Sequence, residues 1–131
     1  GSAFKYEATP DSDFVATFER LLMHCPQAVL LVAGFEGDAR WQLAQENTQG
    51  RLRTLGPLPQ SALRQLHAAS DLYVEGFPFG TTTALLEAAA AGLPVLLPPQ
   101  SCPPPFATDG LAIDGPNLSR NENLHCCTSF C

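Results

Sequence analysis

Residues 71–97, DLYVEGFPFGTTTALLEAAAAGLPVLL, contain the pattern that decides the fold of this chain. The order of residue types predicts a strand, a loop of small residues, a helix, a tight turn and a second strand. The first N–H groups of a helix lack acceptors within the helix and carry the positive end of its dipole, so a loop of small residues there favours a bound phosphate. The residues of this predicted phosphate-binding loop are Gly80, Thr81, Thr82 and Thr83.

Glu87 follows this loop inside the predicted helix. Its carboxylate is expected at the same end of the sheet as the threonine hydroxyls, where a ribose would lie beside its phosphates. Two simpler interpretations stay open. The threonines can act as N-caps alone, and the helix dipole by itself favours an acidic residue near the start of a helix.

The rest of the chain repeats the alternation of strand and helix. Strands are predicted over 4–8, 28–33, 51–55, 71–74, 95–97 and 111–113. Helices are predicted from an N-cap at Asp11 or Ser12 to His24, over 38–49 with Gly50 as the C-cap, over 60–69 and over 82–91. Short connections between strands and helices favour an α/β fold of three layers, in which helices cover both faces of a mostly parallel sheet.

Ligands of such sheets bind beyond the carboxyl ends of the strands. The loops expected at that edge are 9–12, 34–38, 56–59, 75–81 and 98–105. Glu75 stands at the end of a predicted strand, where turn chemistry and a role in lining the site are both open.

Composition narrows the class of protein. The length of 131 residues predicts one domain, over 1–117. Residues 118–131 are polar and show no periodicity, which predicts a tail that is non-native or disordered. A net charge of −6 with seven lysines and arginines argues against a nucleic-acid partner. The longest apolar run is interrupted by Glu87 and Pro94, so no membrane span is expected, and no signal peptide is recognised.

The five cysteines have no regular spacing, which predicts a reducing, cytoplasmic compartment and no disulfide framework. Three of them lie in the tail beside His125. Structural zinc sites use two separated pairs of ligands, so we expect no metal there.

Several short motifs together carry a resemblance. They are LGPL at 55–58, FPFG at 77–80, LEA at 86–88 and GLPV at 92–95. In this order they resemble the C-terminal half of GT-B glycosyltransferases, above all the O-linked N-acetylglucosamine transferase family and its bacterial relatives. The resemblance extends over about residues 4–100 and implies a Rossmann-like domain that binds a nucleotide-sugar donor, expected to be UDP-linked, with no further cofactor.

The resemblance also implies roles for individual residues. Thr82 and Thr83 would contact the diphosphate, and Glu87 would accept hydrogen bonds from the ribose. Leu58 and Gln60 would face the base, and Lys5 would contact the donor phosphates.

In this family an N-terminal domain supplies the acceptor surface and usually the catalytic base. We expect this chain to lack that domain, so the catalytic residues stay unknown and the fragment alone is expected to be inactive. An incomplete half is also expected to expose apolar surface and to self-associate. Two alternatives remain open, which are half of a nucleotide-sugar epimerase and a non-enzymatic Rossmann-like binding module.

Overall fold

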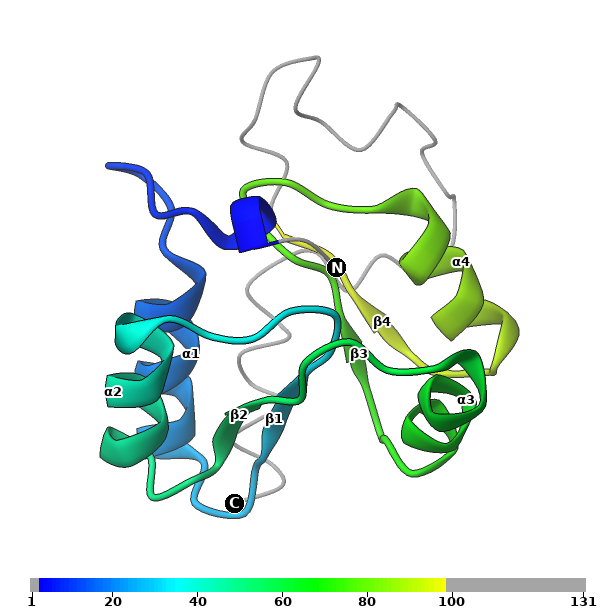
Figure 1. The fold of residues 1–131 in the computed structure, drawn as a ribbon, viewed down its shortest axis with the longest axis horizontal. Helices are drawn as coiled ribbons and strands as arrows, with labels where there is room; N and C mark the ends of the chain where they lie inside the picture. The colour runs from blue at the N-terminus through cyan, green and yellow to red at the C-terminus, as the bar shows by residue number, and fades with distance from the viewer. Residues whose placement is uncertain (1–2, 99–131) are drawn as a thin grey trace.

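The computed structural model describes residues 3–98. Four α-helices and one 3-10 helix alternate with short strands in this part of the chain (Figure 1). The helices are η1 (Ala3–Tyr6), α1 (Phe14–His24), α2 (Ala39–Asn47), α3 (Gln60–Ala68) and α4 (Thr82–Ala90). The strands are β1 (Leu30–Val32), β2 (Leu52–Thr54), β3 (Tyr73–Val74) and β4 (Val95–Leu96).

The strands pair in parallel, as the sequence predicts. β1 pairs with β2, with Leu30 opposite Leu52, and β3 pairs with β4, with Tyr73 opposite Val95. The strands are two or three residues long and form two separate pairs instead of one continuous sheet. The mixed α/β class is therefore confirmed, whereas the three-layer Rossmann-like architecture is not. Figure 1 shows α1 and α2 on one side of the strands and α3 and α4 on the other.

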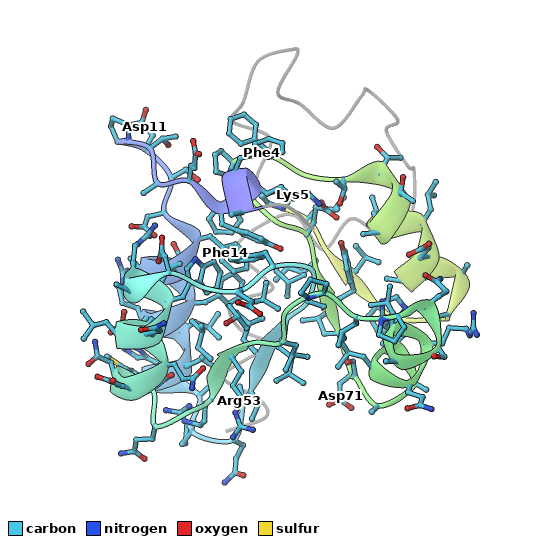
Figure 2. The ribbon with its side chains drawn as sticks, viewed as in Figure 1. Phe4, Lys5, Asp11, Phe14, Arg53 and Asp71 are labelled. Carbon is cyan, nitrogen blue, oxygen red and sulfur yellow. The ribbon has the colours of Figure 1, made fainter. Side chains whose placement is uncertain are left out.

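The core lies between α1, α2 and the first strand pair. One face of α1 is buried at helical spacing, and β2 and α2 contribute further buried side chains. Figure 2 shows Phe14 in the interior of the fold, whereas Asp11, Arg53 and Asp71 lie at its periphery. The buried members of this core are Phe14, Val15, Phe18, Leu22, Val32, Phe35, Trp41, Ala44 and Leu52. The apolar side chains that recur along α1 therefore form its buried face.

The N-terminal segment differs from its prediction. Residues 4–8 were expected to form a strand, but Ala3–Tyr6 is the 3-10 helix η1 and the Glu7 N–H donates to the Phe4 carbonyl oxygen (3.2 Å). The side chains explain this turn. The Phe4 ring packs on Phe79 with ring centroids 5.6 Å apart, whereas the Tyr6 ring enters the core beside Phe14 at 4.7 Å.

Two helix caps also differ from their predictions. The N-cap of α1 is Asp13, whose Oδ1 accepts from the Ala16 N–H (2.9 Å), because the backbones of Thr9 and Ser12 pair with each other in an isolated antiparallel bridge. The C-cap of α2 is Thr48 instead of Gly50. The helix ends two residues earlier because Gln49 takes a positive φ of 56°, a conformation outside the α-helical region.

The remaining expectations on organisation concern the end of the chain. The predicted strand over 111–113, the boundary at 117 and the tail over 118–131 lie outside the described residues.

Within residues 3–98, no helix combines the length and the apolar character that crossing a bilayer requires. Exposed apolar side chains do occur in this part, among them Leu31, Leu55 and Leu72 on or beside the strands. Self-association stays a prediction.

Candidate functional site

The connection from β3 to α4 has the form that the sequence predicts. After Val74 the chain turns through a cis Phe77–Pro78 peptide bond and reaches Thr81 in an extended conformation (φ −134°, ψ 116°). Thr81 is the N-cap of α4, so the predicted loop of Gly80 and three threonines does lead into a helix N-terminus. Thr82 and Thr83 occupy the first two helical positions, and both are exposed.

The N-terminus of α4 is not capped by a side chain of its own N-cap residue. An N-cap threonine usually accepts a hydrogen bond from an N–H group of the first helical turn. Thr81 makes no such bond. The N–H groups of Thr82, Thr83 and Ala84 therefore have no acceptor in the helix or on the N-cap side chain.

The Thr81 hydroxyl instead contacts Lys5, a residue distant in the sequence. Lys5 Nζ donates to Thr81 Oγ1 (2.7 Å), across 76 positions of the chain. Lys5 lies in η1 and is only 7% exposed. The Phe79 N–H donates to the Lys5 carbonyl oxygen (3.4 Å), which also joins η1 to this loop. Figure 2 shows Lys5 extending from η1 toward the connection that leads to α4. The structure therefore brings together two of the predicted phosphate-binding residues.

A buried carboxylate lies beside this contact. Glu75 directly follows β3 and is 1% exposed. Its Oε2 accepts from the Tyr73 hydroxyl (2.9 Å), and its Oε1 accepts from the Thr81 N–H. Glu75 is thus the group that fixes the backbone at the N-cap of α4. One weak signal in the sequence points to Glu75, namely an acidic residue between an apolar strand and the FPFG motif.

The electrostatics of the site come from one buried cation and one buried anion. Burial lowers the pKa of the Lys5 ammonium group, and the negative charge of Glu75 opposes this effect. Burial raises the pKa of the Glu75 carboxyl, and hydrogen bonds from Thr81 and Tyr73 together with the Lys5 charge oppose the rise. Each charge thus stabilises the ionised form of the other.

Two phenols share this surrounding. Burial and then the charge of Glu75 raise the pKa of Tyr6 to about 12. The same two causes, in the same order, raise the pKa of Tyr73 well above its ordinary range. Both phenols therefore stay protonated at neutral pH, and Tyr73 acts toward Glu75 as a donor.

Three other predicted site residues make no side-chain hydrogen bond to this centre within the described residues. Glu87 is half-buried on α4, Leu58 is half-buried after β2, and Gln60 is the exposed first residue of α3. No side-chain hydrogen bond within the described part of the chain joins any of these three residues to Lys5 or Thr81. Their roles at the ribose and the base stay predictions.

Among residues 3–98, no group of three histidine, cysteine, aspartate or glutamate side chains is arranged to hold a metal ion. His125 and the cysteines beside it lie outside this range.

The chain gave no match to protein-family models, to curated proteins or to solved structures.

Proposed function

We propose that this chain is the donor-binding domain of a glycosyltransferase and that it binds the diphosphate of a nucleotide sugar at the N-terminus of α4. The observation that carries the proposal is the hydrogen bond between Lys5 and the N-cap residue Thr81. This bond places the Lys5 ammonium group beside a helix end whose first N–H groups are uncapped, and such an end favours an anion.

The exposed hydroxyls complete the chemistry that a diphosphate requires. Thr82 and Thr83 lie on the first turn of α4 and are open to solvent, so each offers a donor beside the backbone N–H groups. Donors fixed in this way stabilise the charge that develops on a departing diphosphate. The donor sugar would be UDP-linked, Glu87 would bind the ribose, and Leu58 and Gln60 would face the base.

The transfer itself requires a second domain. The acceptor oxygen forms the new bond to the anomeric carbon while the bond to the β-phosphate oxygen breaks, and the acceptor proton passes to a base outside this chain. This chain would therefore hold the leaving group and not activate the acceptor. We expect it to bind nucleotides without measurable turnover.

Isothermal titration of the chain with UDP, GDP, ADP and TDP tests the proposal. At least one nucleoside diphosphate should bind, and the double variant Thr82→Val/Thr83→Val should lose roughly 1–3 kcal/mol of binding free energy through the lost charge-assisted hydrogen bonds. Thr17→Val is the matched control, because Thr17 is an exposed threonine in the first turn of α1.

The outcomes separate the alternatives. Binding that is weakened by the double variant and unaffected by Thr17→Val supports the proposal. Unchanged affinity in a folded double variant would restrict both threonines to a structural role. Failure of all four nucleotides to bind would favour a non-enzymatic binding module.

A further inference from the structure

The buried carboxylate of Glu75 has no place in the donor contacts described above. A carboxylate removed from water is strongly destabilising unless hydrogen bonds and an opposite charge compensate it. Glu75 has both kinds of compensation, because Tyr73 and the Thr81 N–H donate to it and the Lys5 charge acts on it. A structural carboxylate could be satisfied by donors alone. The cation at this site therefore calls for a separate explanation.

Thr81 connects the two charges through different atoms. Its N–H donates to Glu75 Oε1, and its hydroxyl accepts from Lys5 Nζ (2.7 Å). The backbone N–H of Thr81 is bonded to Glu75 and its hydroxyl to Lys5, and the hydroxyl makes no hydrogen bond to the helix. This arrangement keeps the first turn of α4 uncapped.

Lys5 is the single lysine of the 131 residues. Six arginines supply the other positive charges of the chain, and none of them makes a hydrogen bond or ion pair with Glu75 or Thr81 in the described part of the structure. Lys5 is therefore the one described cation in contact with the N-cap of α4.

We propose that Glu75 is a positioning residue, which holds Lys5 and the N-cap of α4 in the geometry that receives the donor diphosphate and does not itself contact the nucleotide. This inference rests on the proposed phosphate site. The groups that face Glu75 are Lys5 and Tyr6 from the N-terminal segment, Tyr73 from β3 and Thr81 from the loop. Removal of the Glu75 charge should therefore act on Lys5 first.

The first measurement follows Lys5 directly and requires no nucleotide. In protein containing lysine labelled with carbon-13 at Cε, one ε-signal reports the titration of Lys5, because the chain has no other lysine. Glu75→Gln should move the titration midpoint of Lys5 to lower pH, since the charge that opposes the burial effect is lost. Glu46→Gln, an exposed glutamate on α2, is the matched control and should leave the midpoint unchanged.

The second measurement is nucleotide affinity by isothermal titration. Glu75→Gln should weaken binding about tenfold or more, as expected when a charge-assisted hydrogen bond is lost. Glu75→Gln keeps an amide oxygen that can accept from the Thr81 N–H, so it removes only the charge that acts on Lys5. The double variant Lys5→Met/Glu75→Gln should therefore bind as Lys5→Met does, within about twofold. The double variant also lacks both buried charges, so this comparison remains valid if Glu75→Gln alone does not fold.

The results distinguish this inference from the proposed function. Absence of nucleotide binding by the unaltered chain would overturn the proposed function, and the Lys5 titration would still test the link to Glu75. An unchanged Lys5 midpoint in Glu75→Gln, or additive losses of affinity in the double variant, would overturn the positioning role.

Discussion

Alkaline pH provides a test of the surroundings of Glu75, because the partly buried Tyr6 phenol interacts with its charge. Its pKa is raised from 10.0 to about 12. Between these two values the folded protein keeps a proton that the unfolded chain releases, so the free energy of unfolding falls as pH rises above 10 and the loss is complete above 12. One pKa unit corresponds to about 1.4 kcal/mol, so the loss should reach about 1 kcal/mol by about pH 11.

Tyr6→Phe isolates this contribution. The variant keeps the ring that stacks on Phe35 (5.3 Å between centroids) and packs edge-on against Trp41 (5.4 Å), and it removes the ionisable hydroxyl. Urea denaturation from about pH 8 to about pH 11 should show that the unaltered protein loses about 1 kcal/mol more stability than Tyr6→Phe. The same pH dependence in both proteins would refute the argument. So would ultraviolet absorbance in which the tyrosines of the folded protein ionise at their ordinary pH.

Two further predictions concern the scaffold of the site. Leu52→Ala should destabilise the fold by about 2–5 kcal/mol in urea denaturation, because Leu52 is 0% exposed, whereas Leu43→Ala, at a side chain 57% exposed, should stay within about 0.5 kcal/mol. Asp13→Ala should lose about 1 kcal/mol through the N-cap bond to Ala16, and Asp13→Asn should restore most of it even though it breaks the exposed ion pair with Arg40. Equal losses in the two Asp13 variants would assign the effect to the ion pair instead.

Helix α1 was predictable from the sequence because burial imposes a helical period on its apolar residues. The apolar side chains of α1 recur on one face, and that face is buried. The segment over 4–8 has no such constraint. Residues 4–8 can form a strand only beside a neighbouring strand, and their own residue types do not show whether such a neighbour is present. In the structure, Phe4 packs on Phe79 and Tyr6 packs on Phe14 in the core. A turn allows these two side chains to point in different directions.

The candidate site was predictable in part, for a related reason. The loop before α4 is a local feature, so its residue types predict a helix N-terminus, and α4 begins there. The contact between Lys5 and Thr81 joins residues 76 positions apart, and only the tertiary fold creates it. The sequence leaves the role of Glu75 open between turn chemistry and lining the site, because an acidic residue at the end of a strand is most often exposed. Its burial is decided by donors from Tyr73 and Thr81.

Because the chain has one lysine and that lysine is buried, proteolysis after Lys5 can report the opening of the N-terminal segment. A protease specific for lysine has one target bond in this chain, after Lys5. While η1 stays packed, the side chain that the enzyme must bind is enclosed. When opening and closing are fast relative to cleavage, the rate of this one cut measures the population in which η1 has left the connection to α4. A ligand that contacts Lys5 would slow the cut, so digestion becomes a measure of occupancy at this end of the molecule.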